Sequence, residues 1–542
     1  MNSPYADFSF IFFSLIPTTF FRFQEHHDGY VLATSKFMDE AFRGDFQYPF
    51  SQYGPLWSII LGILNNVSPD KYLLLVIRFF SVLCVAISVG ILSQLSKKIF
   101  HRKLSFIFSL AIVITWYLFG PYYGWPSIFL LPIITFIIVN FVKIIHKDDK
   151  TNFHILTIGV FISLVQFLRI QVGISLLIFA IFLCAFLKFK GLFVRLITGY
   201  LLGNSFMFLY LQSIGALKPA IFDQFLFAFK FHLSSERGAL RVPIWTLIIL
   251  TLTFFLAANF QKITSVLSLK KTEVIALVAS LTLISMFIVE IINPTDFLSN
   301  FHWRVLQRVF VGVVLGMAIF SFYVSCRKLL ENRKSSNISR LQLSQVQFLF
   351  AGVALAVATQ TYPLFASHHV WYSLIPVLFS AHSQIIQIFK VLPLVNFAKY
   401  WKYVGLFCLI YLLAWNMDNA SFSVKSPMKQ IVFVEKTESN SLSGLREFLD
   451  KRVPNSSKVH NFCPDPTVYV VRDDLIPASR LIVWWKHFDQ FSEYLKLAKE
   501  PADFAIVCAE NVNSFLKTNS DNWQLDSVYS GLQSEYLYRY SN

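Results

Sequence analysis

The chain has 542 residues, of which 55% are hydrophobic and 14% are charged, and apolar runs recur from one end to the other. This composition is typical of a polytopic membrane protein and excludes an ordinary soluble globular domain. The formal net charge of +16 comes from Lys and Arg in short clusters between apolar runs, so we do not expect nucleic acid as a partner.

Thirteen apolar runs approach the length of about 20 residues that crosses a bilayer, with shorter ones accommodated by tilt. The first has no basic segment before it and no small-residue cleavage site, so we expect it to be a retained span. Only the short sequence "RIQ" at 169–171 divides the fifth and sixth runs, so a kinked or re-entrant segment remains an alternative there. The predicted spans lie near 5–21, 72–95, 104–120, 126–145, 153–168, 171–187, 192–212, 243–260, 273–292, 306–325, 346–362, 371–389 and 403–417.

The loop charges predict the orientation of these spans. If the amino terminus is cytoplasmic, the inner loops are all basic and the short outer turns "GPYYGWPS" and "YPLFASHH" carry no Lys or Arg, as expected because cytoplasmic loops retain basic residues. The loops 22–71 and 213–242 and the carboxy-terminal region are then outside. We therefore expect a multi-pass protein of the plasma (inner) membrane, with these parts in the periplasm or extracellular space, in contact with membrane lipids.

The composition changes near residue 418, which divides the chain into a membrane domain, 1–417, and an extracytoplasmic domain, 418–542. The second part predicts a small α/β domain. Its expected helices are 442–453 and 488–499, and its expected strands are 458–463, 467–471, 503–509 and 535–540. Cys463 and Cys508 share this polar region, and a disulfide between them is left open.

The first outer loop contains "EHHDGYVLATSKFMDEAFRGDFQYPFSQYGPLW", residues 25–57. A partial apolar stripe at Val31, Leu32, Met38 and Phe42 predicts a helix that ends at Gly44. A second short helix is expected from "LWSIILGIL". Amphipathic helices of this kind lie along the membrane surface.

Several residues of this loop form a pattern: Asp28 soon after the first span, Gly44 and Asp45 at the helix end, Pro49, and "YGPLW" at 53–57, followed by Arg78 in the next span. Here the sequence resembles the GT-C superfamily of membrane glycosyltransferases, particularly the branch of aminoarabinose transferase and protein O-mannosyltransferases. It departs by having HHDG where many relatives have two consecutive acidic residues, and by lacking WWDYG, so block transfer for N-glycosylation is not expected.

The resemblance implies an inverting glycosyltransferase that moves a hexosyl or pentosyl unit from a polyprenyl-phosphate donor to a glycan, lipid or protein acceptor. Asp28 would be the general base and Asp45 a second catalytic candidate. The alternatives are that Asp28 only caps a helix beginning at Gly29, and that Asp45 is a solvated surface carboxylate. The sequence identifies no cofactor and no metal site, although a divalent cation is compatible with the chemistry.

The substrate-binding candidates are basic or aromatic residues at the outer surface. Arg304 and Arg308 lie one helical turn apart and could clamp a phosphate, or could instead contact lipid headgroups or Glu290 and Asp296. Arg78, Arg169, Arg237 and Arg241 are second choices for the phosphate, and the loop 213–242 is compatible with a flap. The full set of candidates is His27, Tyr53, Arg78, Arg304, Arg308, His368 and His369.

Two other classes fit the composition: a secondary transporter or lipid flippase, and a surface-polysaccharide polymerase or ligase. A transporter concentrates polar residues near the bilayer midplane, in paired broken helices. This chain concentrates them in outer loops and carries an outer domain, which favours the glycosyltransferase.

Overall fold

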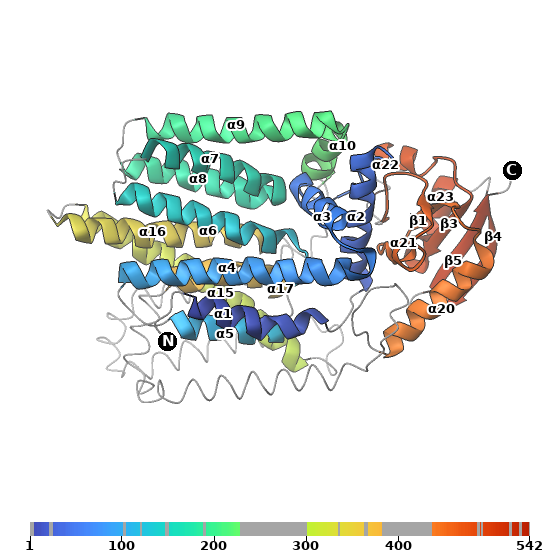
Figure 1. Cartoon of the computed structure of the whole chain (residues 1–542), viewed down its shortest axis with the longest axis horizontal. Coiled ribbons are helices and arrows are strands. Elements are labelled where there is room, and N and C mark those ends of the chain that lie inside the picture. Colours follow the sequence, from blue (N-terminus) through green and yellow to red (C-terminus); the bar gives the residue numbers. More distant parts are fainter. Residues whose placement is uncertain are drawn as a thin grey trace.

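The computed structural model describes residues 5–20, 25–51, 53–100, 105–119, 122–146, 151–187, 191–227, 301–333, 337–361, 367–381, 436–484, 488, 492–519, 523–530 and 534–540. These form a bundle of apolar helices with a small α/β domain at one end (Figure 1). The predicted fold class, mostly helical with a small mixed domain, therefore agrees with the structure.

The bundle helices lie side by side (Figure 1). Five segments are long and apolar enough to cross a membrane: Asp70–Ile99, Pro126–Ile145, Leu192–Ser213, Phe310–Asn332 and Ile338–Ala358. The helices of the bundle are α1 (Ala6–Leu15), α4 (Leu73–Phe100), α5 (Ser105–Phe119), α6 (Pro126–Ile145), α7 (Thr151–Leu168), α8 (Ile170–Leu187), α9 (Leu192–Ser213), α15 (Phe301–Asn332), α16 (Ile338–Ala358) and α17 (Ser367–Ser380).

Each of these helices overlaps a predicted span, although the bounds of α15, α16 and α17 differ from the predicted ones by several residues. The predicted spans near 243–260, 273–292 and 403–417 lie outside the described residues. The total of thirteen spans therefore stays a prediction.

The closely spaced pair α7 and α8 is a helical hairpin, because the two helices lie side by side (Figure 1) and the chain turns at Arg169. A Cβ atom at Gly173 would lie 2.4 Å from the Cα atom of Gln166, so the tight turn requires glycine there. This geometry replaces the alternative of one kinked helix.

The predicted first outer loop contains two helices, α2 (Glu25–Arg43) and α3 (Pro55–Val67), as expected from the sequence. Gly44 follows α2 with a φ of +83°, the left-handed conformation that commonly ends a helix. Both helices lie at the end of the bundle that carries the α/β domain, together with α10 (Leu217–Ile221) (Figure 1). The described parts of the two predicted outer loops and of the carboxy-terminal domain therefore share one end.

The carboxy-terminal domain is built on a five-stranded sheet with the order β2-β1-β3-β5-β4. Strands β1, β2 and β3 are parallel, whereas β5 is antiparallel to β3 and β4. The strands are β1 (Lys458–Phe462), β2 (Ile476–Pro477), β3 (Phe504–Cys508), β4 (Trp523–Ser530) and β5 (Ser534–Tyr540). The helices are α20 (Lys436–Arg452), α21 (Thr467–Val471), α22 (Ser492–Leu497) and α23 (Val512–Asn519).

One predicted strand is wrong, because residues 467–471 form the short helix α21. Val468, Tyr469 and Val471 are all buried, and a short, fully buried apolar run has no periodicity that separates strand from helix. Helix α22 is also shorter than the predicted helix 488–499, and β4 was not predicted. Cys463 and Cys508 form a disulfide, which settles the pairing left open by the sequence.

Candidate functional site

Asp28 and Arg78 form a buried ion pair. Helix α2 begins at Glu25, so Asp28 lies inside the helix, and the alternative that it caps a helix beginning at Gly29 is wrong. Arg78 Nη2 donates to Asp28 Oδ2 at 2.8 Å, and the two side chains are only 2% and 6% exposed. Arg78 Nη1 also donates to the carbonyl of Thr19 at 2.9 Å. The carboxylate is thus held in one place with a fixed counter-charge.

The carboxy-terminal domain covers α2 near this pair. A Cβ atom at Gly29 would lie 3.1 Å from Thr467 Oγ1, and the ring of Tyr469 packs edge-on against Phe37 at 5.4 Å. Helix α21, mistaken for a strand from the sequence, therefore packs directly on the helix that carries Asp28.

Gly54, Pro55 and Trp57 of the "YGPLW" turn each have a structural role. A Cβ atom at Gly54 would lie 1.8 Å from the carbonyl oxygen of Phe167, so only glycine permits this approach to the α7–α8 hairpin. Pro55 opens α3 at its first position, where no amide donor is needed. Trp57 Nε1 donates to the carbonyl of Gly124 at 2.6 Å. The turn therefore packs the first loop against the α7–α8 hairpin and against the connection that contains Gly124.

Four aromatic side chains, His27, Tyr122, Trp125 and Tyr53, form a continuous row, which we call the aromatic row. His27 stacks on Tyr122 with ring centroids 3.4 Å apart and meets Trp125 edge-on at 5.1 Å. Trp125 contacts Tyr53 at 4.8 Å, and the guanidinium of Arg169 lies 4.6 Å from the Tyr53 ring centroid. The row therefore runs from the neighbour of Asp28 to Arg169.

The structure does not bring Asp45 to Asp28. About 22 Å of helix separates Asp28 from Arg43, at about 1.5 Å per residue, and Asp45 is exposed beyond that end. The buried carboxylate at this end is Asp39, which accepts from Arg43 at 2.5 Å and from Asn66 at 3.0 Å. Asp39 ties α2 to α3, and Asp45 has the exposure of a solvated surface residue.

For the remaining predicted candidates, the structure describes at most the helix on which the residue lies. Arg304 and Arg308 lie in the first turns of α15, and His368 and His369 lie in the first turn of α17. Their side chains lie outside the described part of the chain, as do Arg237 and Arg241. The phosphate clamp and the histidine contacts stay predictions.

Sequence reasoning missed a second buried charge cluster, around Asp223 in the π-helix Phe222–Phe227. Arg480 of the carboxy-terminal domain donates to both Asp223 oxygens, at 2.7 and 2.9 Å, and the Tyr494 hydroxyl donates at 3.0 Å. The amide of Ser51 in the first loop completes the set at 3.4 Å. Burial raises the pKa of the Asp223 carboxyl, and Arg480 acts in the opposite direction.

This cluster fastens both outer loops to the carboxy-terminal domain. The described part of the predicted flap is therefore anchored through Asp223. No local sequence signal marks Asp223, because its partner lies 257 residues away. An isolated carboxylate in an apolar stretch, "AIFDQFLF", is the only hint that the sequence offers.

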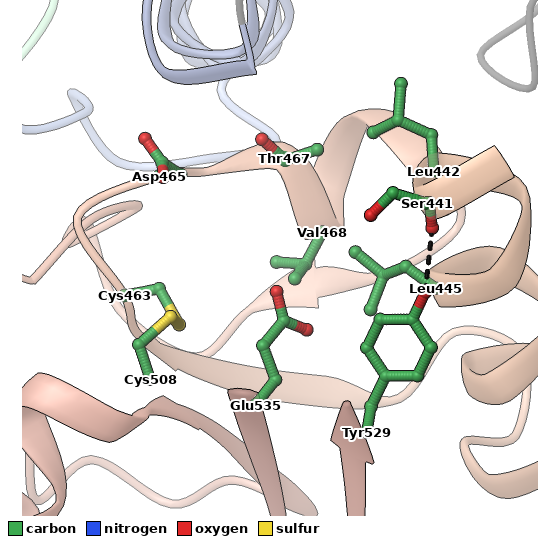
Figure 2. Close-up of a pocket in the computed structure, with 10 residues that line it drawn as sticks. All are labelled: Ser441, Leu442, Leu445, Cys463, Asp465, Thr467, Val468, Cys508, Tyr529 and Glu535. Atoms are coloured by element: carbon green, nitrogen blue, oxygen red, sulfur yellow. Dashed lines mark hydrogen bonds between the residues drawn. A yellow bond between two sulfur atoms is a disulfide. The ribbon is translucent and has the colours of Figure 1, made fainter. Parts of the chain in front are cut away.

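The carboxy-terminal domain has a small hollow of its own. Figure 2 shows the Glu535 carboxyl group pointing into it between the disulfide and Tyr529, whose hydroxyl bonds the carbonyl of Ser441 at 2.9 Å. Its volume of about 20 Å³ holds roughly one water molecule. It is too small for a sugar. Among the described residues, no group of three or more His, Cys, Asp or Glu side chains could hold a metal ion.

No protein-family model and no curated protein matches the sequence. Among solved structures, the chain is similar to the oligosaccharyltransferase of Archaeoglobus fulgidus, crystallised with zinc and sulfate, with 12% identity and a TM-score of 0.44 over 94% of this chain and 69% of that one. It is also similar to ArnT from Cupriavidus metallidurans bound to undecaprenyl phosphate, with 13% identity and a TM-score of 0.44 over 98% and 96% of the two chains. Both proteins are GT-C glycosyltransferases.

Proposed function

We propose that the protein is a membrane glycosyltransferase of the GT-C type, which transfers one sugar from a polyprenyl-phosphate donor to an acceptor at the non-cytoplasmic face. The observation that carries the proposal is the Asp28–Arg78 pair. Asp28 is the residue that the first-loop motif assigns as base, and its carboxylate is buried and ion-paired at the end of the bundle that carries the outer loops. Ionisable groups are costly near lipid and are usually kept there for function.

The reaction requires one proton transfer and one displacement. The acceptor hydroxyl attacks the anomeric carbon of the donor sugar while the Asp28 carboxylate takes its proton. The bond between that carbon and the phosphate oxygen breaks, and the electron pair leaves with the phosphate. Attack from the face opposite the phosphate inverts the anomeric configuration. Arg78 orients the carboxylate through the 2.8 Å hydrogen bond.

Two observations support an outer location for the carboxy-terminal domain. Its two cysteines, Cys463 and Cys508, are joined in a disulfide, and disulfides persist mainly in oxidising compartments outside the cytoplasm. Cys84, Cys184 and Cys326 in the bundle are free thiols. The basic last turn of α4 lies at the other end of the bundle, as expected of a cytoplasmic end.

Mass spectrometry of cell-envelope glycans from cells with and without the protein tests the reaction and identifies both substrates. Transferase activity predicts a new glycosidic linkage that depends on the protein, with a matching loss of lipid-linked sugar. A transporter or flippase would change the distribution of the lipid-linked sugar between the two leaflets without a new linkage, and that result would exclude our proposal.

Cysteine labelling in intact cells tests the sidedness. In a variant that keeps the disulfide but has the other four cysteines of the sequence, Cys84, Cys184, Cys326 and Cys408, replaced, Glu447→Cys on α20 should react with a membrane-impermeant maleimide, since Glu447 is exposed. Arg340→Cys, exposed at the start of α16, is the matched control and should react only after the membrane is opened. The reverse pattern would contradict action at the outer face.

A further inference from the structure

Arg169 occupies the turn of the α7–α8 hairpin, at the end of the bundle where Asp28 lies. The close approach of Gly54 to Phe167 brings the Tyr53 ring to within 4.6 Å of the guanidinium. Arg169 Nε donates to Ser127 Oγ at 3.3 Å. An aromatic face and a neutral hydroxyl therefore hold the side chain.

The charge of Arg169 has no counterpart in the described part of the chain. Its Nη2 atom is closed off from solvent and has no hydrogen-bond partner there. No carboxylate of the described residues lies within ion-pair distance of it. An uncompensated charge is strongly unfavourable in such surroundings, so a fold that keeps one generally holds it for an external partner.

Other buried arginines of this protein are neutralised internally. Arg78 bonds Asp28 at 2.8 Å, and Arg480 bonds Asp223 at 2.7 and 2.9 Å. Arg169 differs because its Nη2 group has no acceptor among the described residues. A guanidinium N–H group matches a phosphate oxygen, with which it forms a strong, charge-assisted hydrogen bond.

We propose that Arg169 binds the phosphate group of the lipid-linked donor; this inference rests on the function proposed above. The aromatic row joins Arg169 to His27, the neighbour of Asp28, so that phosphate and base occupy opposite ends of one surface. Arg78, predicted from the sequence to bind substrate, has its charge committed to Asp28 and is a positioning residue.

Binding of polyprenyl phosphate to the full-length protein in nanodiscs of zwitterionic lipid tests the assignment. Loss of a charge-assisted contact should weaken binding at least tenfold in Arg169→Gln. Arg169→Lys keeps the charge without the planar guanidinium group, so its affinity should lie between those of the parent and of Arg169→Gln. Arg340→Gln is the matched control, because Arg340 is exposed at the opposite end of the bundle.

Competition identifies the source of the phosphate. Inorganic phosphate and vesicles containing phosphatidylglycerol should displace polyprenyl phosphate only weakly. Equal competition by the free ion would mean a site for soluble anions, and equal competition by phosphatidylglycerol would mean a site for bulk lipid headgroups. Either result overturns the assignment to the donor.

Thermal unfolding without ligand gives a second, independent readout. Since the charge of Arg169 is uncompensated, Arg169→Gln should unfold at the same temperature as the parent or at a higher one. A lower temperature, or a variant that does not fold, would mean that Arg169 holds Tyr53 and Ser127 for structural reasons.

The outcomes separate this inference from the proposed function. If the parent protein does not bind polyprenyl phosphate, the proposed function fails. If the parent binds and Arg169→Gln binds equally well, the role of Arg169 is refuted and the proposed function stands.

Discussion

Arg78 of α4 donates to the Asp28 carboxylate of α2 across 50 residues of sequence, at 2.8 Å, with both side chains almost fully excluded from solvent. The pair joins a helix of the first outer loop to a long helix of the bundle. Each charge compensates the other, so the two residues are energetically coupled.

Arg78→Gln should lower stability by about 3–5 kcal/mol, because it leaves the Asp28 carboxylate buried without its counter-charge. Thermal unfolding of the full-length protein in detergent measures the change. The double variant Asp28→Asn with Arg78→Gln should lose clearly less than the sum of the single variants. Strict additivity would show that the two charges are not coupled.

Gly54→Ala should disrupt the contact between the first loop and the α7–α8 hairpin, because its Cβ atom would lie 1.8 Å from the Phe167 carbonyl oxygen. We expect a destabilisation of about 1–3 kcal/mol or more and a displaced Tyr53. Hydrogen exchange of residues 48–60 would report it. Gly44→Ala, where nothing lies within 4 Å, should cost only the left-handed backbone strain of about 1–2 kcal/mol, without local opening at Tyr53.

Arg480→Gln should loosen the carboxy-terminal domain from the outer loops, since it removes both charged hydrogen bonds to Asp223. The buried carboxyl would then take up a proton, in line with the effect of burial on its pKa. Limited proteolysis should cleave the variant near the domain junction faster than the parent. Glu447→Gln, which removes an exposed ion pair, is the control and should leave cleavage unchanged.

His460 should make the carboxy-terminal domain sensitive to acid. The residue is 3% exposed, its Nε2 atom bonds the carbonyl of Glu500 at 2.8 Å, and burial lowers its pKa from the ordinary value of 6.5. Below pH 6.5 the unfolded chain binds a proton that the folded chain does not, so stability is lost as the pH falls toward the lowered pKa.

Unfolding temperatures measured between pH 7.5 and 5.5 should therefore fall more steeply for the parent than for His460→Gln. Glutamine can still donate to the Glu500 carbonyl but does not titrate. Parallel curves for the two proteins would show that His460 does not contribute to the pH dependence.

The apolar runs predicted the bundle helices well, because a bilayer-length run in this composition has few other structures open to it. Helices α2 and α3 and the end of α2 at Gly44 followed from local pattern and turn chemistry. These features depend on residues that are close in sequence. They could therefore be predicted from the sequence without knowing how the helices pack.

The site could be predicted only in part. Asp28, Arg78, His27 and Tyr53 lie in one region, but the partner of Asp28 and the role of Arg169 depend on contacts made through α4 and the α7–α8 hairpin. The Asp223–Arg480 cluster spans 257 residues and has no sequence periodicity. Charge compensation is a property of the folded arrangement, so residue type alone could not distinguish Arg78, which is paired with Asp28, from Arg169.

The most direct measurement of the central claim is the initial rate of sugar transfer by equal amounts of folded, reconstituted Asp28→Asn and Asp39→Asn proteins, with the donor identified from the envelope glycans. Both substitutions neutralise a buried carboxylate of α2 that is paired with an arginine. Loss of a general base predicts a rate about 10²–10⁴-fold below the parent for Asp28→Asn, and a rate close to the parent for Asp39→Asn. Transfer by Asp28→Asn at the parental rate would contradict the assignment of Asp28 as the base.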